Sequence, residues 1–159
     1  MGQKVFNVLF LSSENSSRSI VAEAVLNHWG KGRFRAFSAG TDPAGEVDPL
    51  ALELLKAANL STEGLRSKNW REFAAPGVPE MDFVIDVGER RIAELQGALP
   101  GNPFAARWTI TDPFAARDNP AERRRAYRRT FGELENRVRL FTLVRHEGLT
   151  PRAQQAQAL

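Results

Sequence analysis

The chain has 159 residues, 42% of them hydrophobic and 26% charged, so it is long and apolar enough to fold as a globular domain rather than stay disordered. We expect a single domain over residues 1–148 and a flexible tail over 149–159. No apolar run approaches the roughly 18 residues of a membrane span. The start lacks a signal-peptide pattern, so we expect a cytoplasmic protein with no membrane partner. Cysteine is absent, which excludes disulfides, thiolate metal sites and a thiol nucleophile in the chain.

Arginine supplies most of the positive charge. The 22 Lys and Arg residues against 19 Asp and Glu give a net charge of +3, and 18 of the 22 are Arg. Guanidinium groups suit phosphate and carboxylate recognition, so we expect an anionic ligand. The excess is small and no aromatic residues are interleaved with basic ones, which argues against nucleic-acid binding. Five arginines lie within 123–129, and we interpret them as the solvated face of a helix.

The first predicted unit is a strand, a polar loop and a helix. Residues 5–11 form a nearly continuous apolar run, which is typical of a strand buried on both faces. Small polar residues follow over 12–19, and helical spacing of apolar residues then runs from Ile20 to a stop at Gly30. A second short strand is predicted at 34–37, ending in Ser-Ala-Gly.

The rest of the chain continues this alternation. Asp48 is the predicted N-cap of the next helix, with Pro49 in its first turn. Apolar runs predict strands at 81–87 and 108–110, and helical patterns cover 48–58, 89–99 and 120–146.

This alternation predicts an α/β fold, a doubly wound four-stranded parallel sheet with right-handed crossovers and cover on both faces. Ligands of such sheets bind beyond the carboxyl ends of the strands. We therefore expect the loops that start at Ser12, Ser38, Asp86 and Asp112 to converge on one site, and the loop 42–49 to lie at its rim.

The loop from Ser12 to Arg18 is the first candidate site. Its small residues can turn successive backbone N–H groups toward an anion, and the following helix adds its positive end. Arg18 can hold two oxygens of an oxyanion through its planar fork. The spacing Ser-x5-Arg alone does not indicate a binding site. The indication comes from the strand directly before the loop and the helix directly after it, as an anion site requires. The alternatives are that Ser12 is a loop residue or helix cap and that Arg18 pairs with Glu23 or a nearby carboxylate on the surface.

Asp112-Pro113 is the second candidate, a carboxylate on a rigid turn after a strand. A carboxyl group there can act as a general acid toward the leaving oxygen of a bound ester. The alternative is that Asp-Pro simply starts a turn.

Residues 8–19 read Val-Leu-Phe-Leu-Ser-Ser-Glu-Asn-Ser-Ser-Arg-Ser, which resembles the phosphate loop of the low-molecular-weight tyrosine phosphatase and arsenate reductase superfamily. The family pattern is Cys-x5-Arg-Ser after a strand, and its nucleophilic cysteine falls on Ser12. The resemblance implies that Asn15 shapes the loop, that Arg18 binds the oxyanion and that Ser19 supports the nucleophile. It implies oxyanion contacts from the whole loop: Ser12, Ser13, Glu14, Asn15, Ser16, Ser17 and Arg18.

Further matches extend the resemblance over about residues 5–145. The segment 37–41 resembles the family's Ser-Ala-Gly after the second strand, and Trp108 followed by Asp112-Pro113 resembles its acid loop. The stretch 65–84 is similar to arsenate reductases in particular. The implied fold is the flavodoxin-like sheet of low-molecular-weight phosphatases, with Asp112 as a catalytic residue beside Ser12 and Arg18 and with no metal.

Ser12 is the main departure from the family. A serine hydroxyl does not ionise near neutral pH and needs a base, and no base is evident in the sequence. Two origins are compatible with Ser12: an engineered replacement of a cysteine, or a natural protein that has lost catalysis. Gly88 stands where thioredoxin-linked reductases carry a resolving cysteine, which indicates that this cysteine was never present and excludes a disulfide relay within the chain.

Three functional hypotheses follow. The first is an arsenate reductase-like protein of arsenical resistance that binds arsenate or phosphate, is catalytically impaired by Ser12, and would need an external thiol reductant, such as a thiol redox protein, and no other cofactor. The second is a phosphatase-like enzyme acting on a phosphoprotein, favoured by the aromatic Phe114 after Asp112-Pro113. The third is a non-catalytic oxyanion-binding or regulatory module, favoured by the absence of cysteine.

Overall fold

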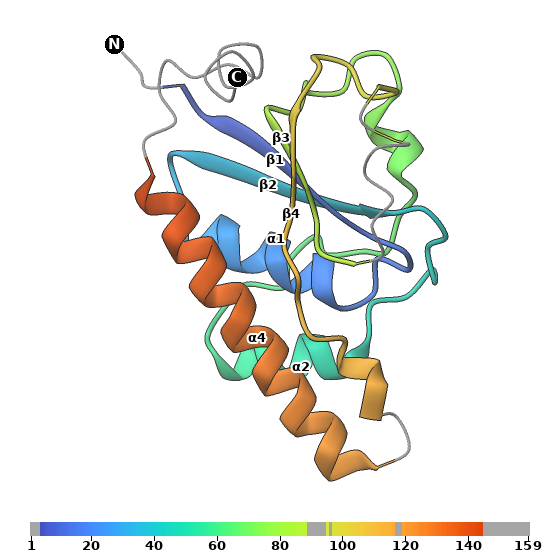
Figure 1. The fold of residues 1–159 in the computed structure, drawn as a ribbon, viewed down its shortest axis with the longest axis vertical. Coiled ribbons are helices and arrows are strands. Elements are labelled where there is room, and N and C mark those ends of the chain that lie inside the picture. Colours follow the sequence, from blue (N-terminus) through green and yellow to red (C-terminus); the bar gives the residue numbers. More distant parts are fainter. Residues whose placement is uncertain (1–3, 89–94, 96, 117–118, 145–159) are drawn as a thin grey trace.

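The computed structural model describes residues 4–88, 95, 97–116 and 119–144. Figure 1 shows a sheet with helices α1, α2 and α4 on one side and the short helix η1 on the other. The strands are β1 (Phe6–Ser12), β2 (Phe34–Gly40), β3 (Phe83–Asp86) and β4 (Phe104–Arg107). The α-helices are α1 (Arg18–Trp29), α2 (Pro49–Ala57) and α4 (Pro120–Leu143), and the 3-10 helices are η1 (Trp70–Phe73) and η2 (Pro113–Ala116).

The four strands form one parallel sheet in the order β2-β1-β3-β4. β1 is central, and its register places Ser12 beside Gly40 of β2 and Leu11 beside Asp86 of β3. The predicted doubly wound, flavodoxin-like parallel sheet is therefore confirmed. Because all strands are parallel, the carboxyl ends of β1, β2 and β3 meet at one edge, where Ser12 lies.

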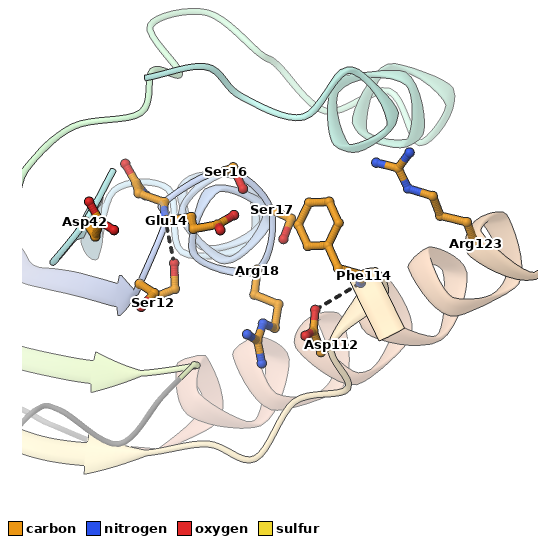
Figure 2. A pocket seen from close by; sticks show the side chains of 11 residues that line it. Ser12, Glu14, Ser16, Ser17, Arg18, Asp42, Asp112, Phe114 and Arg123 are labelled. Atoms are coloured by element: carbon orange, nitrogen blue, oxygen red, sulfur yellow. Dashed lines mark hydrogen bonds between the residues drawn. The ribbon is translucent and has the colours of Figure 1, made fainter. Parts of the chain in front are cut away.

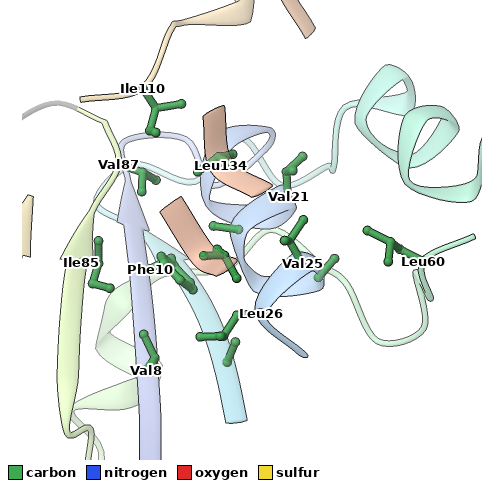
Figure 3. Close-up of a cluster of buried hydrophobic side chains, with 14 of the residues drawn as sticks. Val8, Phe10, Val21, Val25, Leu26, Leu60, Ile85, Val87, Ile110 and Leu134 are labelled. Carbon is green, nitrogen blue, oxygen red and sulfur yellow. The ribbon is translucent and has the colours of Figure 1, made fainter. Parts of the chain in front are cut away.

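The core has two parts, one on each face of the sheet. Successive strand residues point to opposite faces, so Val8 and Phe10 of β1 pack toward α1 and α4, while Leu9 and Leu11 pack toward η1. Figure 3 shows the larger part, in which Leu134 of α4 meets the side chains of α1 and the sheet. The strand that carries Ser12 is thus buried on both faces, which fixes the position of the loop that follows it.

The fourth strand is not where the sequence predicted it. The β-favouring residues Trp108 to Ile110 lie outside the strand, and the weakly β-forming segment 104–107 pairs with β3 instead. Tertiary packing overrides local propensity here, because Phe104 pairs with Phe83 and their rings meet edge to face, with centroids 6.3 Å apart. The prediction of a strand at 108–110 was wrong, because the strand lies just before it, at 104–107.

One helix start, that of α2, has the cap that the sequence predicted. The Asp48 carboxylate accepts the Leu50 N–H at 3.0 Å and caps α2, as predicted. Asn119 caps α4 by accepting two N–H groups of its first turn. α1 begins at Arg18, two residues before the predicted start. Most of the predicted helix 89–99 and the predicted tail 149–159 lie outside the described residues.

Among the helices of the described residues, none combines the length and apolar character that a membrane span requires.

Candidate functional site

The backbone between β1 and α1 turns its carbonyl groups toward the segment that follows β2. Four carbonyl oxygens of the loop accept backbone N–H groups of this segment: Ser12 from Thr41 at 3.3 Å, Ser13 from Asp42 at 2.8 Å, Glu14 from Ala44 at 2.9 Å, and Ser16 from Asp48 at 2.9 Å. In a trans peptide the carbonyl of one residue is antiparallel to the N–H of the next. The N–H groups of residues 13, 14, 15 and 17 are therefore directed to the opposite, inner side of the loop.

Asn15 shapes this loop from within. It is fully buried and has a φ of 47°, in the left-handed region that asparagine tolerates better than most residues. Its side-chain oxygen accepts the Lys68 N–H at 2.9 Å, and its amide donates to the Ser19 hydroxyl at 2.8 Å. Gly40 faces the loop so closely that a Cβ there would lie 3.1 Å from Asn15 Cβ. The loop conformation is thus fixed by neighbours on both sides.

Ser12 lies at the start of the loop and is almost fully buried, with 9% of its surface exposed. Its hydroxyl oxygen is 2.7 Å from the Ser19 hydroxyl and accepts the Asn15 N–H at 3.2 Å. Gly88 lies behind it, where a Cβ would be 3.1 Å from the Ser12 Cβ. Within the described residues, the hydrogen-bond partners of the Ser12 hydroxyl are therefore a second hydroxyl and a backbone N–H.

Arg18 is the first residue of α1, and its Nη1 donates to the carbonyl of Ile110 at 3.3 Å. This contact draws the guanidinium toward the segment that leads to Asp112. Arg18 does not pair with Glu23, because Glu23 accepts the Ser38 hydroxyl and lies 3.7 Å from Lys68. The alternative pairing of Arg18 with another nearby carboxylate stays a prediction.

Glu23 and Lys68 form a buried pair under the loop. Burial raises the pKa of the Glu23 carboxyl, although Lys68 opposes the shift, and burial likewise lowers the pKa of Lys68 against the attraction of Glu23. The Lys68 backbone N–H holds Asn15, so this pair supports the loop from below.

One cavity collects the predicted residues. It has a volume of about 550 Å³ and is lined by Ser12, Ser13, Glu14, Asn15, Ser16, Ser17, Arg18, Asp42, Asp112, Phe114 and Arg123. Figure 2 shows Arg18 and Asp112 on the same side of this cavity, with Phe114 above them. All seven loop residues named from the sequence line it together with Asp112, whereas Ser19 reaches it through Ser12.

Two of the four expected loop starts lie outside the cavity lining. The Ser38 hydroxyl donates to Glu23, and the Asp86 carboxylate accepts the Gly88 N–H at 2.8 Å. The loop after β2 contributes Asp42 instead, an exposed residue of the predicted rim.

Asp112 is exposed at the cavity and begins the turn into η2. Its carboxylate accepts the Phe114 N–H at 2.9 Å, and Phe114 lines the cavity beside it. The interpretation of Asp112-Pro113 as the start of a turn is therefore confirmed, and Asp112 also lines the cavity. Its role as a general acid stays a prediction. The free carboxylate oxygen of such a turn can face a ligand while the other oxygen holds the backbone.

The sequence interpretation missed Arg123. This residue was assigned to the solvated face of the last helix, but it lines the cavity, with its Nη2 2.6 Å from the Asp48 carboxylate and its guanidinium 5.4 Å from the Phe114 ring. The signal was present: Arg123 lies one helical turn before the core residue Tyr127, so both share the inner face of α4.

Tyr127 ties the same corner to the loop. Its hydroxyl donates to the Asp48 carboxylate at 2.6 Å. Burial, and then the contact with Asp48, raise the pKa of the Tyr127 phenol well above its ordinary value. Asp48 in turn donates its N–H to the Ser16 carbonyl, so α2 and α4 brace the cavity wall together.

The hydrogen-bond donors of the cavity are backbone N–H groups, hydroxyls and guanidiniums, which suit an anion, and the carboxylates of Glu14, Asp42 and Asp112 also line it. In the part of the chain that the structure describes, no group of three or more His, Cys, Asp or Glu residues is placed to hold a metal ion.

Comparison with known proteins agrees with this geometry. A family model described as Low molecular weight phosphotyrosine protein phosphatase matches residues 7–151. The solved arsenate reductase of Archaeoglobus fulgidus is 28% identical, with a TM-score of 0.66 over 86% of this chain and 99% of that one. An arsenate reductase in the phosphate binding state is 21% identical, with a TM-score of 0.68 over 87% of this chain and 98% of that one.

A phosphonate complex of the same fold is also similar. Vibrio vulnificus Wzb, solved with benzylphosphonate, is 16% identical, with a TM-score of 0.66 over 88% of this chain and 99% of that one. The comparison with curated proteins finds no match. Since the family model covers nearly the whole chain, the protein belongs to the low molecular weight phosphotyrosine protein phosphatase family.

Proposed function

We propose that the protein is an arsenate reductase-like member of this family that binds phosphate or arsenate in the loop 12–18 and is catalytically impaired. The observation that carries the proposal is the direction of the loop backbone, whose carbonyls are held outward by segment 41–48. The loop, the start of α1 and Arg18 line the same cavity, which supports oxyanion binding by N–H groups, the positive helix end and a guanidinium together.

The impairment follows from the surroundings of Ser12. A hydroxyl nucleophile needs a base to take its proton. The Ser12 hydroxyl instead meets the Ser19 hydroxyl and the Asn15 N–H, neither of which is a base. The same N–H groups that would stabilise a thiolate stabilise a bound anion equally well. We therefore expect binding without turnover.

The arsenate-reductase relation supports the choice of oxyanion. The Archaeoglobus fulgidus arsenate reductase is the relative described above with the highest identity. With a thiol at position 12, Asp112 would lie across the cavity to protonate the oxygen that leaves arsenic or phosphorus. An external thiol, such as that of a thiol redox protein, would complete a reduction; no metal or organic cofactor is part of the proposal.

A phosphatase-like role is the second candidate, and Phe114 favours it. Its ring lines the cavity beside Asp112, where it can pack against the ring of an aryl phosphate. In this role a phosphoprotein would be the partner, and with Ser12 the protein would bind the phosphorylated side chain rather than hydrolyse it.

Calorimetry of phosphate and arsenate binding tests the proposal. We expect both anions to bind the wild type, and Arg18→Gln to weaken binding by about 10- to 100-fold, the range for losing a charged hydrogen-bond partner. Arg137→Gln removes the same charge at an exposed position of α4 and should leave binding unchanged. If neither anion binds the wild type, the loop assignment is wrong.

The variant Ser12→Cys tests the chemistry. We expect no arsenate reduction or aryl phosphate hydrolysis by the wild type, and one of the two activities when the thiol is present. Reduction that depends on added thiol supports the arsenate reductase relation, whereas hydrolysis supports the phosphatase relation. Turnover by the wild type would refute the proposed impairment.

A further inference from the structure

The mouth of the cavity carries opposite charges at its two ends. Glu14 and Asp42 are exposed carboxylates at one end, and Arg123 lies at the other. Figure 2 shows Asp42 and Arg123 at opposite sides of the lining residues, with Phe114 and Arg18 between them. Asp112, beside Phe114, is a third carboxylate of the lining, and Arg18 and Arg123 are its two guanidiniums. A second anionic group on a ligand held at the loop is therefore repelled from the Asp42 end, and beyond Phe114 it is attracted by contact with Arg123.

Arg123 is held in place before any ligand binds. Its Nη2 lies 2.6 Å from the Asp48 carboxylate, and its guanidinium lies 5.4 Å from the ring of Phe114 and 6.0 Å from that of Tyr127. Its side chain is 31% exposed, so it is reachable but partly screened from water. A contact with such a side chain costs little further conformational entropy.

The ion pair with Asp48 does not engage all the N–H donors of the Arg123 guanidinium. Asp48 also accepts the Tyr127 hydroxyl at 2.6 Å and the Leu50 N–H at 3.0 Å, so its charge is shared among three donors. A guanidinium carries five N–H donors in a planar fork, and the Asp48 contact engages Nη2. Among the residues that the structure describes, Nη1 has no hydrogen-bond acceptor, so its donors can serve an anion that enters the cavity.

The cavity is larger than an inorganic oxyanion needs. Its volume of about 550 Å³ lies in the range of small-molecule pockets, which is roughly 300–1,000 Å³. Phosphate has five heavy atoms and fills only the loop end. The space beside Phe114 can therefore hold an organic group attached to the phosphate.

We propose that the cavity takes an organic phosphate that carries a second anionic group, with the phosphate on loop 12–18 and the second group on Arg123. The phosphate half rests on the proposed function, and the Arg123 half is new. Arg123 is then the residue that selects among phosphorylated ligands, by favouring those with a carboxylate or second phosphate beyond the position of Phe114.

Two phosphonates that cannot be hydrolysed test this inference: benzylphosphonate and 4-carboxybenzylphosphonate, measured by calorimetry beside inorganic phosphate. We expect the carboxylate to increase affinity for the wild type by about tenfold, as a charge-assisted hydrogen bond does. Arg123→Gln should reduce this tenfold difference in affinity between the two phosphonates to about one. Arg124→Gln, which removes the neighbouring charge on α4 that pairs with Glu53 outside the cavity, should keep it.

The ratio separates selection from a structural role. If Arg123 only fastens α4 to Asp48, its loss weakens both phosphonates equally and leaves the ratio intact, which would overturn the inference. Arg123→Lys keeps the charge for folding and should retain part of the ratio. If the two phosphonates bind the wild type equally while phosphate binds, the inference fails alone; if phosphate also fails to bind, the proposed function fails with it.

Discussion

Replacing Gly40 by alanine tests how the oxyanion loop is held. Gly40 ends β2 beside Ser12, and its N–H donates to the Lys68 carbonyl at 2.9 Å. A Cβ at this position would lie 2.5 Å from the Ser13 carbonyl oxygen and 3.1 Å from Asn15. Because backbone lies on both sides, neither partner can give way as a flexible side chain would.

The size of the effect follows from this overlap. Ordinary contacts between heavy atoms lie near 3.5 Å, so the added Cβ penetrates the Ser13 carbonyl by roughly an ångström. Overpacking of this kind costs about 1–3 kcal/mol, and the loop is the part that must move. We expect Gly40→Ala to lower the free energy of unfolding by about 2 kcal/mol and to weaken phosphate binding by at least about tenfold, since each 1.4 kcal/mol changes affinity tenfold.

Urea unfolding and calorimetry with phosphate measure both quantities. Gly132→Ala is the matched control: it makes the same substitution in α4, where a Cβ meets nothing within 4 Å. There we expect a stabilisation of about 0.5–1 kcal/mol, because alanine favours a helix over glycine, and unchanged phosphate binding. If Gly40→Ala folds and binds phosphate like the wild type, the Ser13 carbonyl does not lie against Gly40, and the inward direction of the loop N–H groups is refuted.

Three further predictions concern stability. Tyr127 is the only tyrosine, and burial raises its pKa above the ordinary value of 10.0. The unfolded chain therefore loses the phenol proton at a lower pH than the folded chain does, so the free energy of unfolding should fall as pH rises above 10.0. Near-ultraviolet absorbance of the phenolate should develop only as the protein unfolds. Asn119→Ala removes the cap of α4 and should cost about 1 kcal/mol in urea unfolding, whereas an unchanged midpoint would contradict the cap. Leu134→Ala opens a fully buried site and should cost about 2–5 kcal/mol, while Leu140→Ala, 63% exposed, should change stability by less than about 0.5 kcal/mol.

The sequence was most informative where one kind of interaction decides the structure. The apolar run at 5–11 predicted β1 because a strand buried on both faces can hold few polar residues. The cap at Asp48 could be predicted because its carboxylate binds the N–H of Leu50, only two residues further along the chain. The fourth strand failed for the opposite reason: segment 104–107 is a strand because Phe83 and the edge of β3 lie beside it, which no local pattern reports.

The candidate site shows the same division. Residues 12–18 and Asp112 could be named from motifs, since each motif sits between a strand and a helix whose order fixes its place. Arg123 could not be separated from the four arginines near it by composition, because its contact with Asp48 joins two helices that are distant in the chain. Its helical phase with Tyr127 was the one local clue, and it becomes decisive only when α4 is packed against α2.

We propose above that binding and catalysis are separated in this loop, and the contacts of the loop support this separation. The loop is held by segment 41–48, Asn15 and the close approach of Gly40, and none of these contacts needs a thiol at position 12. A thiolate only accepts hydrogen bonds, whereas a hydroxyl both donates and accepts, so Ser12 can share a proton with Ser19 across 2.7 Å while it receives the Asn15 N–H. The Ser12 hydroxyl therefore holds the start of the loop through two hydrogen bonds, and neither bond removes its proton. These contacts support our proposal that the chain binds an oxyanion without transforming it, and affinity for phosphate is therefore the first property to measure.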